Sequence, residues 1–185
     1  IEPMKCGTEE FEVHLPEELI AAELEPNRVE LPQRTPAEHI RWALDHPVDS
    51  APLKELVKAG DKVCIVISDV TRRWQSPETY IPVLIAELEC AGIRDEDMLI
   101  ISATGTHRRQ TPEEHMGLVT KEVYERIELV DHVCTDEENL SYVGTTSRGT
   151  PVWLDKRALA CDKIILTGGV VYHFMAGFGG GRKSI

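Results

Sequence analysis

The sequence lacks the features that would place this protein in a membrane or on nucleic acid. No apolar run approaches the roughly 20 residues that span a bilayer, and the first residues, Ile1 to Cys6, lack the basic and apolar regions of a signal peptide. Basic residues are outnumbered, since 20 against 32 acidic ones give a formal net charge of −12. A surface of that sign repels a phosphate backbone. We therefore expect no membrane and no nucleic acid among its partners.

Cysteines are also few, and their spacing suggests no pairing. The five lie far apart and form no CxxC pair, so neither a disulfide framework nor a structural zinc site is indicated. Cys64 lies in an apolar run and is expected to be a small core residue. With 42% hydrophobic and 28% charged residues, the chain is typical of one ordinary globular domain in a reducing cytoplasm.

Strand-like and helix-like segments alternate from Lys62 onwards. The predicted buried strands are rich in β-branched residues and lie at 63–67, 98–101 and 163–167. The predicted helices start at a capping residue followed by proline and glutamate, at Thr35, Ser76 and Thr111. A hairpin is predicted around 142–154. This alternation predicts an α/β fold, a three-layer Rossmann-like domain with a mainly parallel sheet and a small β-hairpin insertion.

Polar segments follow each of the three predicted strands. Asp69 to Arg73 follows the first, Thr104 to Arg109 the second, and a glycine-rich segment, residues 167–185, follows the third. Because the carboxyl ends of parallel strands meet at one edge, where open α/β sheets bind ligands, we expect these segments to converge. Their arginines, lysine and histidines would form a local positive patch suited to a carboxylate or a phosphate.

The glycine segment (residues 167–185) contains six of the chain's 13 glycines. It does not match a common phosphate loop, because both a Walker A loop and a GxGxxG motif starting at Gly177 need glycine where Arg182 stands. Two interpretations remain from the residues alone. The segment is either a structural turn or a loop that delivers Arg182 and Lys183 to an anionic or electrophilic ligand.

The candidate site residues also have plain structural explanations. Asp69 is able to cap a turn, Arg72 to form a surface ion pair, and His173 to be a core histidine. His107 lies on a turn among charges, where a core histidine would not, and two histidines at one edge favour acid and base roles. Two other histidines have no such neighbouring site residues and are expected to be exposed: His115 and His132.

Three motifs, in this order and at this spacing, resemble the nickel-dependent lactate racemase family. They are Asp69-Val-Thr-Arg72, Ala103-Thr-Gly-Thr-His107-Arg and His173-Phe-Met-Ala-Gly-Phe-Gly-Gly-Gly-Arg182-Lys183. The combination is specific, whereas each motif alone is weak, and the likeness runs from about Lys62 to the end. It implies that residues 1–185 are the amino-terminal catalytic domain of a longer protein, incomplete at its C-terminal end and without the second domain.

The resemblance implies a racemase or epimerase of a 2-hydroxy acid such as lactate. In this family a nickel pincer nucleotide takes hydride from C2 and returns it to the opposite face. By the resemblance, His107 and His173 move the hydroxyl proton and Arg72 binds the substrate carboxylate. Lys183 matches the lysine that carries the cofactor, and the remaining expected cofactor contacts are Asp69, Gly179, Gly180, Gly181 and Arg182.

The same resemblance implies cofactor-synthesis proteins as partners. The family's nickel-binding histidine lies beyond Lys183, so we expect no metal ligand within these residues and no activity from this chain alone. Arg73 stands where the family usually has proline, which either changes the loop or adds a charge for a second substrate carboxylate.

Two rival interpretations remain. One is a non-catalytic nucleotide- or carboxylate-binding module. The other, weaker one is a hydrolytic metal site built on His107 and His173, which no HExxH motif supports.

Overall fold

The computed structural model describes residues 2–25, 27 and 30–185, and the chain forms two compact units, Ile1–Gln33 and Arg34–Ile185. The first unit contains an antiparallel hairpin of β1 (Glu2–Cys6) and β2 (Glu9–Val13), followed by a 3-10 turn at Glu17–Leu19. All candidate site residues belong to the second unit.

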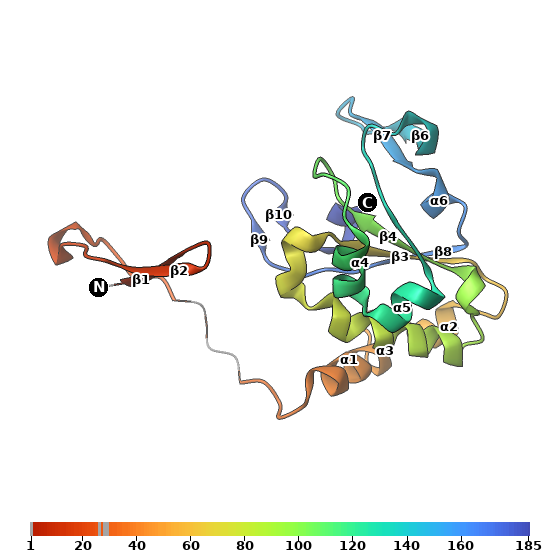
Figure 1. Cartoon of the computed structure of the whole chain (residues 1–185), viewed down its shortest axis with the longest axis horizontal. Coiled ribbons are helices and arrows are strands. Elements are labelled where there is room, and N and C mark those ends of the chain that lie inside the picture. Colours follow the sequence, from red (N-terminus) through yellow and green to blue (C-terminus); the bar gives the residue numbers. More distant parts are fainter. Residues whose placement is uncertain (1, 26, 28–29) are drawn as a thin grey trace. The chain divides into compact units, whose positions relative to one another are not determined.

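The second unit is built on a four-stranded parallel sheet in the order β5-β4-β3-β8 (Figure 1). Its strands are β3 (Val63–Ser68), β4 (Met98–Ala103), β5 (Glu128–Asp131) and β8 (Lys163–Leu166). The three predicted strands are confirmed, each to within two residues of its predicted end. The sequence did not predict β5, which extends the sheet beyond β4.

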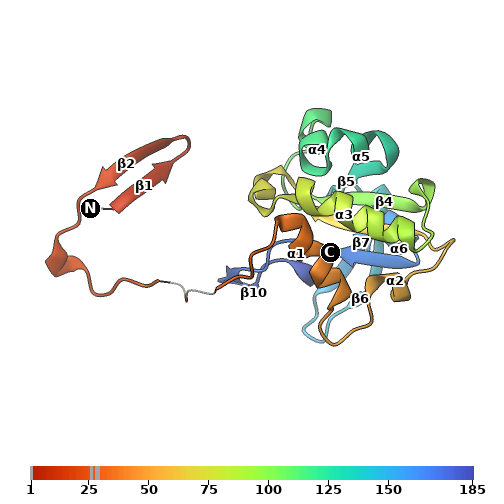
Figure 2. The same ribbon diagram turned by 90° about the horizontal axis from the view of Figure 1, so that it is seen from below.

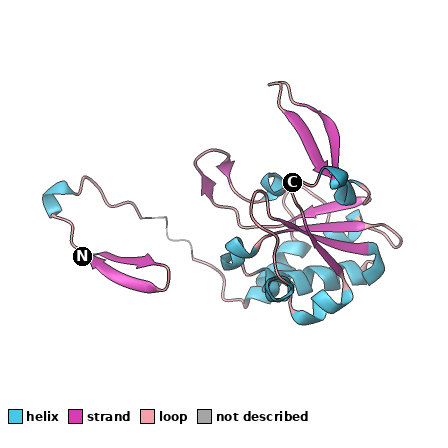
Figure 3. Cartoon of the chain, turned by 45° about the horizontal axis from the view of Figure 1, so that its top comes forward, coloured by secondary structure: helices cyan, strands magenta, loops and turns pink. Residues whose placement is uncertain are grey.

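Helices cover one face of this sheet (Figure 1 and Figure 3). They are α1 (Pro36–Asp45), α2 (Leu53–Leu56), α3 (Pro77–Cys90), α4 (Pro112–Val119) and α5 (Lys121–Arg126). Figure 2 looks from the helix side and shows α1, α3, α4 and α5 next to one another. Thr35 and Thr111 begin α1 and α4 with the predicted capping boxes, in which the threonine hydroxyl accepts from the N3 amide while the N3 glutamate accepts from the cap amide.

The main core lies between this helical layer and the sheet. Ile65, Ile67 and Ile100 point from the strands onto the apolar stripe of α3, which includes Ile81 and Leu88, all fully buried. Complete burial of such side chains stabilises by roughly 1.5–3 kcal/mol each. The two central strands therefore form a rigid base for the loops at their carboxyl ends.

The other face carries a thinner layer. It consists of the hairpin of β6 (Leu140–Thr145) and β7 (Pro151–Asp155) and the one-turn helix α6 (Lys156–Leu159). The predicted hairpin insertion is thus confirmed, as is the mixed α/β fold. Cys64 is a fully buried core residue on this face, as predicted, and burial raises the pKa of its thiol to about 12.

The glycine segment forms a small hairpin of β9 (Tyr172–His173) and β10 (Gly177–Phe178), followed by a 3-10 turn at Gly181–Ser184. Many of its apolar side chains are exposed, and Phe174 is 95% exposed. In the part of the chain that the structure describes, no helix is both long and apolar enough to span a membrane.

Candidate active site

The predicted convergence of the loops occurs at the carboxyl edge of the sheet. A pocket of about 350 Å³ opens there between the segments that follow β3, β4 and β8. Its lining comes from all three predicted segments and from the residue after β5: Ser68, Asp69, Arg72, Ala103, Thr104, Gly105, Thr106, His107, His132, Lys183, Ser184 and Ile185. We call it the histidine 107 pocket.

A second pocket, of about 260 Å³, adjoins the first and is lined by much of the glycine segment. It holds His173, Gly179 and Gly180, with Trp74 and Gln75 from the turn after β3. We call it the glycine pocket. The two pockets share Ser68, Arg72, Lys183 and Ser184, so Arg72 and Lys183 border the pocket of His107 as well as that of His173. Two further predicted site residues line neither pocket: Gly181 and Arg182.

Asp69 and His107 form a hydrogen-bonded pair in the first pocket, with the carboxylate buried and the imidazole about half exposed. The Asp69 carboxylate is 3% exposed and begins the 3-10 turn Val70–Gln75, where it accepts from the Thr71 amide and hydroxyl at 3.2 and 2.6 Å. Its second oxygen lies 2.5 Å from His107 Nδ1. Asp69 is therefore both the cap of a turn and the group that orients His107.

His173 is held differently, by hydrogen bonds from backbone amides rather than by a carboxylate. Its Nδ1 accepts hydrogen bonds from the amides of Met175 and Ala176, at 3.2 and 3.1 Å, and its ring stacks on Phe174 with centroids 5.2 Å apart. His173 is half-buried at the start of a tight turn. It is not a core histidine.

Arg72 and Lys183, the two cations that line both pockets, have no side-chain partners among the described residues. No side-chain hydrogen bond or ion pair is formed there by Arg72 or Lys183. Arg73 points away from both pockets, because its guanidinium lies against Gly117 of α4, 3.4 Å from where a Cβ on that glycine would stand. Arg73 therefore packs on a helix and adds no charge to either pocket.

Gln110 ties the first two loops together, and the sequence analysis missed it. Its carboxamide oxygen accepts from the Val70 amide at 2.7 Å, beside Asp69. Its nitrogen donates to Ser102 Oγ at 2.7 Å and to Asp131 Oδ1 at 2.8 Å, and its own amide donates to Asp131 Oδ2 at 2.8 Å. The loops that carry Asp69 and His107 are thus anchored to each other and to the ends of β4 and β5.

His115 belongs to the same network, and the prediction that it is exposed was wrong. It is 8% exposed, and its Nε2 lies 2.9 Å from Asp131 Oδ1. Burial alone raises the pKa of Asp131, but the hydrogen bonds from Gln110 and His115 outweigh that effect and leave the pKa lowered. Asp131 therefore stays ionised and fixes both donors.

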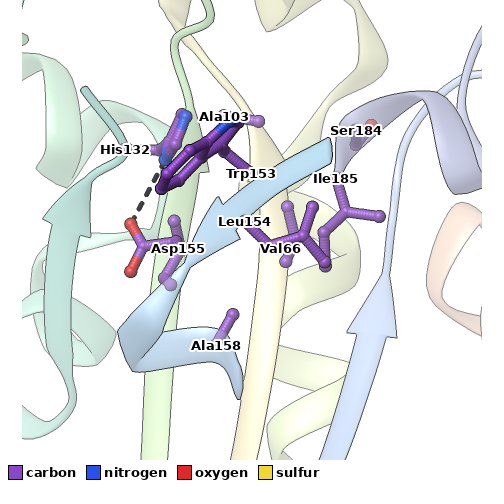
Figure 4. Close-up of a pocket in the computed structure, with 10 residues that line it drawn as sticks. Val66, Ala103, His132, Trp153, Leu154, Asp155, Ala158, Ser184 and Ile185 are labelled. Carbon is purple, nitrogen blue, oxygen red and sulfur yellow. Dashed lines mark hydrogen bonds and ion pairs between the residues drawn. The ribbon is translucent and has the colours of Figure 1, made fainter. Parts of the chain in front are cut away.

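His132 was also wrongly predicted to be exposed. Its Nδ1 lies 3.2 Å from Asp155 Oδ2 on β7 (Figure 4). The residue lines both the histidine 107 pocket and an apolar cavity of about 70 Å³ whose lining includes Val66, Ile101 and Trp153. Arg157 also bonds Asp155. Burial raises the pKa of Asp155, and the bonds from Arg157 and His132 outweigh it, so the pKa is lowered. His132 lies directly after β5, a position that would have signalled the site only if this strand had been predicted.

The glycines of the last segment allow it to fold closely on itself. A Cβ on Gly180, which has φ +73°, would lie 2.8 Å from the Gly169 carbonyl oxygen, and a Cβ on Gly169 would lie 2.8 Å from the Trp74 ring. Next to them, Gln75 Oε1 is buried without a hydrogen-bond partner in the described chain. The glycine pocket thus combines a tight backbone wall, an unpaired acceptor and the free amine of Lys183.

Comparison with known proteins gives one consistent result. A family model described as the lactate racemase N-terminal domain matches residues 6–185. Curated lactate racemases from Lactiplantibacillus plantarum and Thermoanaerobacterium thermosaccharolyticum are 34% and 32% identical over 148 and 146 residues, which is 80% and 79% of this chain and 34% of each relative. The chain therefore spans about a third of the length of these curated relatives.

Solved structures agree with the sequence matches. The lactate racemase apoprotein from Thermoanaerobacterium thermosaccharolyticum superposes with a TM-score of 0.80 and 29% identity, over 98% of this chain and 42% of that one. A crystal structure of a Thermotoga maritima protein gives a TM-score of 0.63 and 25% identity, over 80% of this chain and 36% of that one. The family match extends the likeness well upstream of Lys62.

Proposed function

Because this chain belongs to the lactate racemase N-terminal domain family, we propose that the complete protein racemises or epimerises a 2-hydroxy acid. The observation that carries the proposal is the grouping of Asp69, Arg72, His107 and Lys183 around one pocket. These residues supply an oriented imidazole, a free guanidinium and a free amine. Such a set matches the hydroxyl and carboxylate of a 2-hydroxy acid next to a tethered cofactor.

Arg72 binds the substrate carboxylate in this proposal. Its guanidinium is exposed, lines both pockets and has no partner among the described residues, so it is available for a planar, bidentate contact that lysine does not offer. A carboxylate held there would place C2 of the substrate beside Arg72, where the two pockets adjoin. Both histidine-bearing surfaces are then next to the reacting carbon.

His107 takes the hydroxyl proton at its free Nε2. The Asp69 carboxylate, 2.5 Å from Nδ1, holds the ring orientation and stabilises the imidazolium formed when the proton arrives, as an aspartate does in a hydrolase triad. Asp69 thus has a positioning role, beyond the cofactor contact that the resemblance implies. His173, which lines the adjoining glycine pocket, serves the opposite face of the substrate.

A nickel pincer nucleotide fits the remaining groups. Lys183 presents a free amine to both pockets, and the glycine pocket offers the unpaired acceptor of Gln75 and the close backbone of Gly179 and Gly180. Lys183 would hold the cofactor covalently. When bound, it supplies the hydride acceptor and donor that the chain's own side chains lack. The chain's contribution is orientation, charge and proton transfer.

A second candidate is a non-catalytic nucleotide- or carboxylate-binding module. The unpaired Arg72 and Lys183 favour it, because two free cations in an acidic protein attract an anion whether or not chemistry follows. Binding alone, however, gives no reason for a carboxylate to orient His107. The two candidates differ in whether stereochemistry at C2 changes.

The test is a chiral assay of the complete protein, produced together with cofactor-synthesis proteins. The proposal predicts that a single enantiomer of lactate or a related 2-hydroxy acid is converted toward the racemate, and that elemental analysis finds nickel in the active protein. A protein that contains no nickel and binds 2-hydroxy acids without changing their configuration would support the binding module.

A further inference from the structure

The two histidines of the site are held through the same ring nitrogen but by opposite kinds of partner. His107 Nδ1 faces a carboxylate oxygen, whereas His173 Nδ1 faces two amide N–H groups. A neutral imidazole carries one proton, on one of its two nitrogens, and the partner of one nitrogen decides which. The two rings are therefore in different tautomers.

For His107 the partner accepts only. Asp69 Oδ1 receives two donors from Thr71 and so carries no proton itself. Because a carboxyl group is in general a stronger acid than an imidazolium, the hydrogen between the two side chains belongs to the histidine nitrogen. The other Asp69 oxygen, Oδ2, must then receive the proton on His107 Nδ1. The Nε2 of a neutral His107 is left with a lone pair.

For His173 the partners donate only. The amides of Met175 and Ala176 both point at Nδ1, so that nitrogen uses its lone pair and carries no proton while these bonds last. The ring proton is on Nε2. His173 is therefore a donor toward anything that reaches it from the pocket, in contrast to His107.

We propose that the two histidines have unequal, prearranged roles in the resting site: His107 Nε2 accepts a hydrogen bond from the ligand hydroxyl, and His173 Nε2–H donates one to a ligand oxygen. This inference rests on the proposed function for the identity of the ligand. An exchange of roles requires the 173–176 turn to release Nδ1 of His173. Asp69 and the two amides are accordingly positioning groups, because they decide which ring nitrogen of each histidine carries the proton.

The direct test is the protonation pattern of each ring in the complete protein without cofactor, at neutral pH. With ¹⁵N-labelled histidine rings, long-range proton–nitrogen correlation spectra distinguish the tautomers, and His107→Gln and His173→Gln variants assign the signals. We expect one tautomer protonated at Nδ1 for His107 and one protonated at Nε2 for His173. The exposed His14, whose ring has a distant contact to Glu12 at 4.0 Å and no hydrogen bond among the described residues, supplies the comparison pattern of a ring that is not fixed.

The Asp69→Asn variant sharpens this test. An asparagine amide donates to His107 Nδ1 and should move the ring proton to Nε2, so the two histidines become alike. In the matured protein the same variant should lower kcat/KM by about 10²- to 10⁴-fold, as the wrong tautomer does in a hydrolase triad.

The spectra do not depend on turnover, so failure of the inference is separable from failure of the proposed function. Identical tautomers in the unsubstituted protein, or a His14-like average at either ring, would overturn the inference even in an active racemase. Distinct tautomers in a protein without racemase activity would leave the inference standing and reject the proposed function.

Discussion

The two sides of the candidate site are built in opposite ways. The loops after β3 and β4, residues 69–75 and 104–110, are fixed by side chains: Gln110 joins Val70, Ser102 and Asp131, and Asp69 joins Thr71 and His107. The glycine segment is held largely by main-chain contacts, such as Gly179 N to Val171 O at 2.8 Å, and exposes most of its apolar side chains. We call the first two loops the anchored loops.

This difference separates two tasks. In the proposed function, the anchored loops carry the groups that transfer the proton and bind the carboxylate, and errors of about 1 Å there are costly. The glycine segment carries Lys183 and His173, and under the same proposal this segment has to admit a large cofactor and adjust around it. Rigid anchored loops beside an adaptable glycine segment would allow both tasks, because local stability differs greatly within one domain.

The largest expected effect comes from removing the proposed base, His107, on the anchored loops. His107→Gln in the complete matured protein should lower kcat/KM by about 10²- to 10⁴-fold, the usual contribution of a general base. The unfolding midpoint should change little, since His107 is half exposed, at 49% of its side chain. His14→Gln is the matched control and should leave racemisation unchanged. Full activity of His107→Gln would remove His107 from the reaction.

A smaller effect is expected at Arg72, the proposed carboxylate-binding residue. Arg72→Lys should cost about 1.5–3 kcal/mol of substrate binding, or roughly 10- to 150-fold in kcat/KM, because lysine does not reproduce the bidentate fork. Arg73→Lys is the matched control, since Arg73 packs against Gly117 of α4. Equal losses for the two variants would show that the carboxylate contact is shared or lies elsewhere.

The anchoring network should appear as a pH-dependent contribution to stability. The folded pKa of Asp131 is below its ordinary value of 3.8, so its contribution is complete above about that pH and is lost as the pH falls through the folded pKa. Asp131→Asn should lower the free energy of unfolding by about 1–3 kcal/mol at pH 7. That deficit should shrink below pH ~4.

Denaturant unfolding at several pH values measures this deficit. Asp45→Asn, at a surface pair with Lys54, is the control and should change stability by less than about 0.5 kcal/mol. A deficit for Asp131→Asn that stays constant down to pH ~3 would contradict the assigned role of its charge.

The smallest effect is expected within the glycine segment. Gly180→Ala forces a side chain into a left-handed conformation and toward the Gly169 carbonyl, which costs about 1–2 kcal/mol locally. Gly179→Ala, whose nearest contact would be 3.6 Å away, should be tolerated. Hydrogen exchange of the residue 179 amide should accelerate only in Gly180→Ala. Equal exchange in both variants would mean that the segment is already open.

Local sequence patterns were sufficient for much of this description. β-branched runs and capping boxes located three of the four parallel strands and the starts of α1 and α4, and parallel topology then placed three motifs at one edge. β5 was missed because Glu128-Leu-Val-Asp131 is short and half charged.

The contacts that fix the site were less accessible to sequence reasoning. The roles of Gln110, His115 and Asp131 depend on the register that pairs Asp131 with Ser102 across β4 and β5. The pairing of Asp69 with His107 joins residues 38 positions apart. Such contacts are set by tertiary packing and leave no local pattern.

The most direct test of the account is the mass of the peptide that contains Lys183 in the complete protein, matured with the cofactor-synthesis proteins. The account predicts that active protein carries one nucleotide cofactor on that peptide. It also predicts that Lys183→Arg, which keeps the charge but lacks the amine needed for a covalent bond, has the unmodified mass and no racemase activity. An active Lys183→Arg variant, or active unsubstituted protein without added mass on that peptide, would contradict it.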